Sequence, residues 1–235
     1  MAFTTREIER TYDKRAARYD LTANLYYLLG FREMEYRRRA IRELDLEPGQ
    51  TVVELCCGTG LNFSLIEERI GPAGRLIGVD LTGGMLRQAQ RRAEKEGWKN
   101  VELVHRDVAT FEFPGKVDRA LSTFALTLVP EYDRVIARAR DALSPGGKLL
   151  LLDLKKPEQR SDLLVRIAAI SARPFGVTFD LASRHPWESV ERYFEDCFFE
   201  NLYFGFAYIV SGWAPGGEER QHRAALRRGS ARGDR

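Results

Sequence analysis

Short apolar runs alternate with amphipathic stretches through the middle of the chain. The apolar runs predict strands at 51–55, 76–80, 101–104, 119–122 and 148–152. Helices are predicted between them at 62–70, 85–96 and 132–143. Strands and helices that alternate on this scale form a mainly parallel sheet with helices on both faces. The pattern therefore predicts an α/β domain that binds its ligand beyond the carboxyl ends of the strands.

Both ends of the chain depart from this alternation. Residues 4–45 are rich in Arg, Glu, Ala, Leu and Tyr without an internal proline, which predicts helices broken near Gly30. Aromatic runs at 198–203 and 206–210 predict an antiparallel pair of strands at the edge of the sheet. After residue 213, arginines stand among Gly, Ser, Ala and Gln, a composition typical of disorder. The predicted divisions are an N-terminal helical cap at 1–45, a central domain at 46–213 and a basic tail at 214–235.

The composition favours one large globular core, since 44% of the 235 residues are hydrophobic and 30% are charged. No apolar run approaches the length that spans a bilayer, and residues 1–7 lack the apolar core of a secretory signal. We therefore expect a cytoplasmic protein. Cys56, Cys57 and Cys197 match neither a disulfide framework nor a zinc-ligand spacing, which predicts free thiols and no metal site.

The first predicted strand runs directly into Cys57-Gly58-Thr59-Gly60 and then into a helix. Glycines at 58 and 60 permit unusual backbone angles and let a bulky ligand approach the main chain. A dinucleotide-binding loop has a third glycine, whereas position 63 is Phe, and the sequence has no Gly-Lys-Ser/Thr phosphate loop. With the acidic Glu54 before it, the loop favours a neutral or cationic nucleoside. The alternative is an ordinary turn between a strand and a helix.

Two aspartates follow the next two predicted strands. Asp80 stands about twenty residues beyond the loop, where a carboxylate accepts hydrogen bonds from both hydroxyls of a ribose. Asp107 is placed to accept from an adenine amino group, while the Val108 amide donates to a ring nitrogen. The alternatives are that Asp80 caps the helix near Thr82 and that Asp107 is a plain turn residue.

Four segments together resemble the class I S-adenosylmethionine-dependent methyltransferases, which have a Rossmann-like α/β fold. They are Glu54-Leu55-Cys56-Cys57-Gly58-Thr59-Gly60, Gly78-Val79-Asp80, Arg106-Asp107-Val108 and Leu143-Ser144-Pro145-Gly146-Gly147-Lys148. Within that class, Tyr12-Asp13, Tyr19-Asp20-Leu21, residues 145–157 and Cys197-Phe198-Phe199-Glu200-Asn201 are similar to the ubiquinone/menaquinone C-methyltransferases. Bacterial phosphatidylethanolamine N-methyltransferases share much of the pattern.

The resemblance implies S-adenosylmethionine as cofactor and S-adenosylhomocysteine as product. The expected cofactor-binding residues are Tyr19, Glu54, Cys56, Cys57, Gly58, Thr59, Gly60, Asn62, Asp80, Leu81, Met85, Asp107, Val108, Ser122 and Phe124. Two positions differ from the family pattern. Cys56 replaces the first glycine of the loop, and Thr127 and Leu128 replace the histidines that many relatives carry after the fourth strand.

Methyl transfer from a sulfonium is an in-line displacement, so the protein chiefly aligns the reactants and excludes water. Tyr19 and Phe124 are the candidate aromatic faces that favour the cation, with simple core packing as the alternative for each. Tyr19 and His185 are the candidate catalytic residues, with His185 as the base and an apolar region at 174–179 lining a lipid-sized pocket. The alternative for His185 is a loop histidine that caps the next helix.

The resemblance implies methyl transfer to an apolar or lipid-like acceptor, either a phospholipid amine or a quinone ring carbon. The cluster Arg37-Arg38-Arg39 predicts peripheral contact with an anionic membrane surface. A nucleic acid acceptor is not expected, because Ser122-Thr123-Phe124-Ala125 differs from the Asn/Asp-Pro-Pro-aromatic segment associated with methylation of base amino groups. The remaining hypotheses are a cofactor-binding regulatory protein without methyl-transfer activity and, least favoured, a dehydrogenase.

Overall fold

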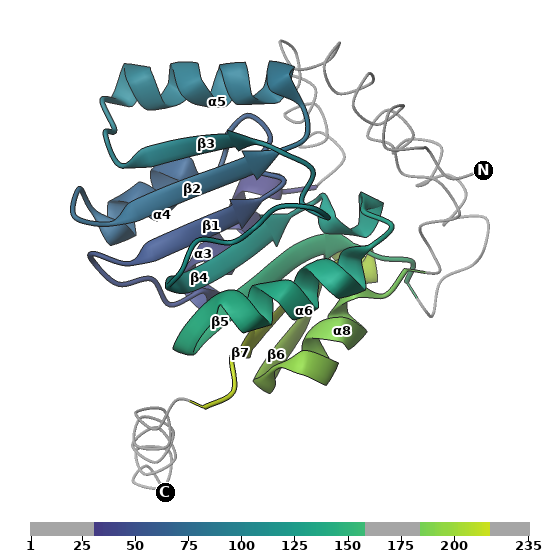
Figure 1. The fold of residues 1–235 in the computed structure, drawn as a ribbon. Coiled ribbons are helices and arrows are strands. Elements are labelled where there is room, and N and C mark those ends of the chain that lie inside the picture. The colour runs from purple at the N-terminus through teal and green to yellow at the C-terminus, as the bar shows by residue number, and fades with distance from the viewer. Residues whose placement is uncertain (1–30, 158–183, 217–235) are drawn as a thin grey trace, which may run out of the picture.

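The computed structural model describes residues 31–157 and 184–216, which form a seven-stranded sheet with the order β3-β2-β1-β4-β5-β7-β6 (Figure 1). The strands are β1 Thr51–Leu55, β2 Arg75–Asp80, β3 Val101–His105, β4 Val117–Thr123, β5 Leu143–Leu154, β6 Glu195–Leu202 and β7 Ala207–Trp213. Strands β1 to β5 pair in parallel, whereas β7 runs antiparallel to both β5 and β6. The predicted mainly parallel sheet with antiparallel C-terminal edge strands is confirmed.

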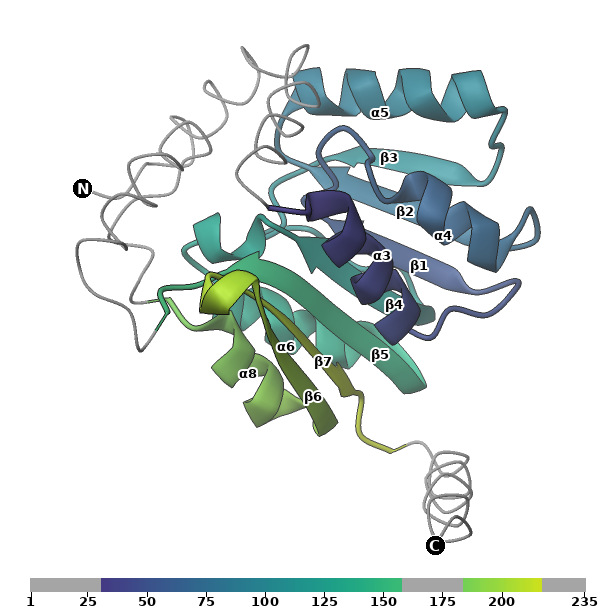
Figure 2. The ribbon, with the colours of Figure 1, turned by 180° about the vertical axis from the view of Figure 1, so that it is seen from behind.

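Helices cover both faces of the sheet, as predicted. They are α3 Glu33–Glu43, α4 Phe63–Ile70, α5 Gly83–Glu96, α6 Tyr132–Ala142 and α8 Pro186–Tyr193, with short 3₁₀ turns η3 Leu126–Leu128 and η6 Tyr203–Gly205. Helices α6 and α8 lie on one face (Figure 1), and α3 and α4 lie on the other (Figure 2). Each face buries its own apolar cluster against the strands. None of the helices in these described ranges is long and apolar enough to cross a membrane.

Helix α3 packs into the core of the sheet. Tyr36, Ala40, Ile41 and Leu44 are buried in the same apolar cluster as Val52 of β1. Their spacing places one face of the helix against the strands, because residues three and four apart lie on the same side of an α-helix. The boundary predicted at residue 45 stays a prediction, and residues 1–30 of the predicted cap lie outside the described ranges.

Strand β5 begins five residues earlier than the sequence predicts. Val117 of β4 pairs with Leu143, and the register then shifts before Arg119 pairs with Lys148. Gly146, with φ of +75°, lies inside this extended segment. Pro145, Gly146 and Gly147 are typical of a turn, so the sequence does not predict that the strand already begins at Leu143.

The parallel strands bring several polar residues to one edge of the sheet. Cys56 follows β1, Asp80 ends β2, Asp107 follows β3 and Thr123 ends β4. Because these strands run in the same direction, all four residues lie at their carboxyl ends. The fold thus places the predicted ligand-binding loops side by side.

The packing of β2 against the loop after β1 leaves no room for a side chain at Gly78. A Cβ at Gly78 would lie 2.9 Å from both Cys57 Sγ and Phe63 Cζ. We expect Gly78→Ala to lower the unfolding free energy by about 1–3 kcal/mol, measured by urea denaturation. Gly115→Ala is the matched control, since a Cβ there meets nothing within 4 Å. Equal losses for the two variants would contradict this account.

Candidate functional site

A cavity opens at the carboxyl edge of the strands. Its walls come from the loops after β1, β2, β3 and β4, together with Arg37 of α3 and Met85 of α5. Ten of the predicted cofactor-binding residues line it: Cys56, Cys57, Gly58, Thr59, Asp80, Leu81, Met85, Asp107, Val108 and Phe124. The structure thus brings these ten residues together at one cavity, and their contacts with a cofactor stay predictions.

The loop after β1 is held in a left-handed backbone conformation. Cys56, Gly58 and Gly60 have φ values of +55°, +57° and +73°. The Cys57 amide donates to the Val79 carbonyl at 2.9 Å, and the Gly60 amide donates to the Cys57 carbonyl at 3.0 Å. A Cβ at Gly58 would meet no atom within 4 Å, and Gly58 lines the cavity. The loop main chain is therefore open to close approach by a ligand.

The Asp80 carboxylate joins this loop to the start of α5. One oxygen accepts from the Gly58 amide and the other accepts from the Thr82 amide, both at 2.8 Å. Burial raises the pKa of Asp80, and the two amide donors oppose that rise. The bond to Thr82, the residue before α5, fits the capping alternative, while the position of Asp80 in the cavity wall fits a ligand role. Ribose binding stays a prediction.

Asp107 and Val108 lie side by side in the wall that follows β3. Asp107 Oδ1 accepts from the Ala109 amide at 2.9 Å, an arrangement typical of an Asx turn. This bond occupies one carboxylate oxygen and gives Asp107 a structural role whether or not a ligand is present. The predicted contacts with adenine stay predictions.

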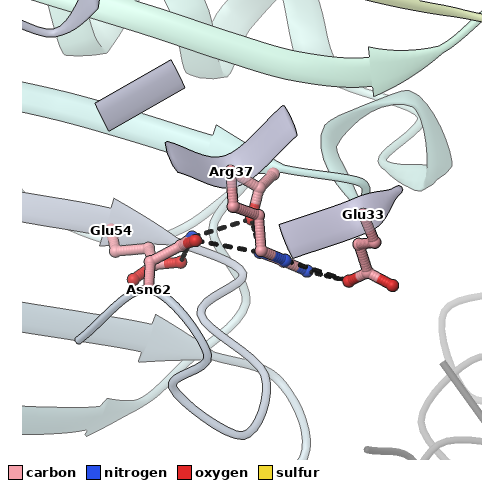
Figure 3. A network of polar contacts seen from close by, with 5 residues as sticks. Glu33, Arg37, Glu54 and Asn62 are labelled. Carbon is pink, nitrogen blue, oxygen red and sulfur yellow. Dashed lines mark hydrogen bonds and ion pairs between the residues drawn. The ribbon is translucent and has the colours of Figure 1, made fainter. Parts of the chain in front are cut away.

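At the cavity wall, polar side chains from α3, β1 and β4 form one network with Asn62, the residue before α4 (Figure 3). Arg37 Nη1 donates to Thr123 Oγ1 at 2.5 Å and to Asn62 Oδ1 at 3.1 Å. The guanidinium also pairs with Glu33 at 2.7 Å. Asn62 Nδ2 donates to Glu54 Oε1 at 2.6 Å. Helix α3 is thereby linked to the strand that leads into the glycine loop.

The membrane-facing role predicted for Arg37 is wrong. Its exposed fraction is 4%, and it lines the cavity and contacts the network described above. Arg38 is exposed, and Arg39 pairs with Glu200 of β6. The prediction treated the run of three arginines as one exposed cluster. The helical period, however, places residue 37 on the same face as Ala40 and Ile41, which are buried.

Glu54 is the fully buried carboxyl group of the network. Its Oε2 atom is buried and has no hydrogen-bond partner within the described part of the chain. Burial raises the pKa of Glu54 to about 7, and the bond from Asn62 and the charge of Arg37 oppose that rise. Glu54, Gly60, Asn62 and Ser122 lie outside the residues that line the cavity, so the predicted cofactor contacts of these four stay predictions.

Phe124 adopts a backbone conformation that bulky residues rarely take, with φ of +55°. Its amide donates to the Leu152 carbonyl at 2.6 Å. The Arg37 guanidinium lies 5.2 Å from the centre of its ring, and Phe31 packs edge-on at 5.6 Å. Phe124 is therefore fixed at the cavity by both α3 and β5.

Thr127 and Leu128 occupy the positions where many relatives carry histidines, and their side chains have different surroundings in the structure. Leu128 lines the cavity. Thr127 is buried, and its amide donates to Asp153 Oδ2 at 2.8 Å. Burial raises the pKa of Asp153 to about 6. Asp153 was not predicted from the sequence, because no neighbouring residue marks it as different from an ordinary polar strand end.

Of the two predicted catalytic residues, His185 lies within the described ranges and does not line the cavity. His185 precedes α8, where its Nδ1 lies 2.9 Å from Glu188 Oε1 and its ring packs on Trp187 at 4.6 Å. This position fits the alternative of a loop histidine at a helix start. Tyr19 and the apolar region at 174–179 lie outside the described residues. The catalytic roles of His185 and Tyr19 stay predictions.

All three cysteines are free thiols, as predicted. Burial raises the pKa of both Cys56 and Cys57 well above the ordinary value, so both thiols are uncharged near neutral pH. A thiolate nucleophile at the loop is therefore disfavoured.

The buried Glu54 carboxyl makes stability depend on pH. Its pKa of about 7 exceeds the ordinary value of 4.5, so the folded state holds the proton more tightly than the unfolded chain. The resulting stability is present at low pH and is lost as the pH rises through about 7. Between pH 4.5 and about 7, we expect the unfolding free energy of the wild type to fall by about 3 kcal/mol relative to Glu54→Gln. Urea denaturation of both proteins across the range measures this, and parallel profiles would contradict it.

The left-handed backbone at Cys56 makes glycine the better residue there. A side chain in this conformation costs roughly 1 kcal/mol, and glycine removes that cost while adding entropy to the unfolded chain. We expect Cys56→Gly to melt at the same temperature as the wild type or higher, in calorimetry. Cys197→Gly, in strand β6, is the control and is expected to melt lower. A lower melting temperature for Cys56→Gly alone would count against this account.

Residues 52–147 match the family model described as a methyltransferase domain. The chain is 27% identical over 152 residues to a demethylmenaquinone methyltransferase of Geobacillus kaustophilus, and the match covers 64% of each protein. A demethylmenaquinone methyltransferase of Listeria monocytogenes serotype 4b is 27% identical over 153 residues, covering 64% of this chain and 63% of the relative. The matched part of the chain thus spans less than two thirds of the length of these relatives.

Solved structures share the fold. A SAM-dependent methyltransferase from Aquifex aeolicus is 18% identical with a TM-score of 0.56, covering 76% of this chain and 89% of that one. The Haemonchus contortus phosphoethanolamine N-methyltransferase 2, bound to phosphomonomethylethanolamine and S-adenosylhomocysteine, is 20% identical with a TM-score of 0.56 and covers 72% of this chain and 38% of that one. The family match and the curated relatives confirm the resemblance of this chain to the class I S-adenosylmethionine-dependent methyltransferases, and to the menaquinone enzymes among them.

Proposed function

We propose that this protein is an S-adenosylmethionine-dependent methyltransferase that acts on an apolar or lipid-like acceptor. The observation that carries the proposal is the Asp80 carboxylate at the end of β2, which lies in the cavity wall beside a glycine loop whose main chain is open to a ligand. The matched methyltransferase-domain family and the names of the curated relatives support the same activity.

The residues of the cavity suit the parts of this cofactor. Asp80 would hold the ribose hydroxyls, and Asp107 with the Val108 amide would hold the adenine. The open loop at Gly58 would accommodate the methionine portion, and the buried Glu54 carboxyl belongs to the strand that leads into this loop. A cationic ligand nearby favours the ionised form of Glu54, whose Oε2 lacks a partner among the described residues. When bound, the sulfonium supplies the methyl group and the positive charge that is dispersed during transfer.

The chain's own part in the reaction is alignment and exclusion of water. Phe124 presents a fixed aromatic face at the cavity, which favours a nearby cation. Leu128, Val129 and Pro130 continue the wall with apolar side chains. Such a wall suits an apolar acceptor better than a charged one.

The acceptor is proposed to be either a quinone ring carbon or a phospholipid amine. The names of the curated demethylmenaquinone methyltransferases support the quinone. The Haemonchus enzyme is named for an amine substrate but is similar to this chain in fold alone, so the amine is the second candidate. For a base, His185 is proposed, with Glu188 orienting its ring. A regulatory protein without methyl transfer is not favoured, because the curated relatives are named for the transfer itself.

Cofactor binding is tested at Asp80. We expect Asp80→Asn to weaken binding of S-adenosylhomocysteine at least tenfold in calorimetry, because a charged acceptor of hydroxyl hydrogen bonds is lost. Asp118→Asn is the matched control. Asp118 also accepts a backbone amide, that of Thr51 at 2.8 Å, but it lies at the amino ends of the strands.

Methyl transfer is tested with radiolabelled S-adenosylmethionine and a mixture of phospholipids and demethylated quinones. Incorporation into the quinone or into the phospholipid identifies the acceptor. Cofactor binding without incorporation into either class contradicts the proposed acceptors, and protection from heat by nicotinamide dinucleotide instead of S-adenosylhomocysteine contradicts the proposed cofactor.

A further inference from the structure

The turn between β6 and β7 carries the most exposed aromatic side chain of the described ranges. We call residues Tyr203 to Phe206 the aromatic turn. Phe204 is 74% exposed, whereas the other exposed large hydrophobic residue, Phe198, is 39% exposed. A single exposed apolar side chain is common on protein surfaces, so exposure alone carries no function.

The backbone of the aromatic turn has an unusual conformation that hydrogen bonds hold in place. Tyr203, Phe204 and Gly205 have consecutive φ values of +45°, +56° and +88°. Residues with large side chains rarely adopt such angles, and they persist where the surroundings fix them. The Phe206 amide donates to the Tyr203 carbonyl at 3.0 Å, and the Lys155 amide donates to the Phe206 carbonyl at 3.0 Å. The backbone conformation of the turn thus determines where Phe204 lies.

A series of aromatic rings connects the turn with the cavity. Phe204 lies 5.6 Å from Tyr203, and Tyr203 packs edge-on against Phe31 at 5.2 Å between ring centres. Phe31 in turn packs against Phe124 at 5.6 Å, and Phe124 lines the cavity. Ring contacts therefore run without a break from Phe204 to the cavity wall.

A lysine lies beside the aromatic turn. Lys156 is exposed and precedes Pro157, and a Cβ placed at Gly205 would lie 3.4 Å from Pro157 Cβ. The ammonium of the preceding Lys155 is instead directed to the rings of Phe199 and Trp187, which pack against the other apolar cluster. An aromatic residue beside an exposed lysine matches the headgroup region of an anionic bilayer, where rings and cations are both stabilised.

A bilayer fits this surface better than a protein partner does. A stable protein interface buries many residues on each side around an apolar centre. Only two large hydrophobic side chains are exposed in the described ranges, and they differ in exposure. Shallow insertion of one ring, supported by a cation, requires no such patch.

We propose that the aromatic turn inserts Phe204 into the headgroup region of an anionic membrane, and that a lipid-like acceptor passes from there along the aromatic series to the cavity. The second part rests on the proposed function, because it assumes an apolar acceptor. The first part requires only the surface described above.

Vesicle binding of the full chain tests the insertion. Vesicles of which half the lipid is phosphatidylglycerol and vesicles of pure phosphatidylcholine are sedimented with the wild type, Phe204→Ala and Phe204→Glu. We expect Phe204→Ala to weaken binding to the anionic vesicles roughly tenfold, and Phe204→Glu to weaken it further because it adds a repelled charge. Binding of the wild type should also weaken in high salt.

Phe198→Ala is the matched control, since Phe198 is exposed on β6 outside the aromatic turn, and its binding should stay within about twofold of the wild type. A wild type that does not sediment with anionic vesicles overturns the proposal, as does an equal loss in Phe204→Ala and Phe198→Ala. Calorimetry with S-adenosylhomocysteine separates the two proposals. Loss of vesicle binding with normal cofactor affinity, as expected for Phe204→Ala, leaves the proposed function intact, whereas a wild type without cofactor affinity removes the proposed function alone.

Discussion

The Asp80 carboxylate is the interaction on which the geometry of the site depends. It ends a buried strand, and its two oxygens accept amides from the glycine loop and from the residue before α5. Gly58 and Asp80 are 22 residues apart in sequence, and their hydrogen bond holds the loops after β1 and β2 at a fixed separation. A buried carboxylate is stable only when donors surround it, so the loop must keep its left-handed angles for the Gly58 amide to reach Asp80. The shape of the cavity follows from this requirement.

A second constraint comes from burying Arg37 beside the site. An unpaired guanidinium in the interior is strongly unfavourable, and Arg37 is satisfied by Glu33, Asn62 and Thr123. Asn62 then donates to both Glu54 and Thr123. The position of α3 is therefore coupled to the strands that carry the loops, and Phe124 is held against the same guanidinium. Residues N-terminal to the matched domain at 52–147 thus belong to the site.

Much of the fold and of the cavity wall was predictable, for a physical reason. Asp80, the glycine loop and Asp107 each stand at the end of an apolar run, and strand direction alone brings such positions together. Arg37 and Asp153 were missed because their environment is created by distant segments, although helical periodicity signalled the burial of Arg37. The early start of β5 was hidden by its turn-like residues. The left-handed angle of Phe124 has no local sequence signal, whereas that of Cys56 is indicated by the glycine that the resembling family has at this position.

The loops of the cavity and the aromatic cluster beside it differ in how the sequence encodes them. The loops consist of short continuous motifs, each carried by one strand and its loop, so one motif determines the local backbone. The aromatic cluster beside the cavity is assembled from side chains that meet only in the folded state: Phe31 before α3, Phe124 after β4 and Tyr203 after β6 pack on one another, and Phe124 lines the cavity. A change in any of the three alters this packing without touching the motifs. Chains can therefore share these loop motifs and differ in the side chains that pack beside the cavity, because the family match covers residues 52–147, whereas Phe31 and Tyr203 of the aromatic cluster lie outside that range.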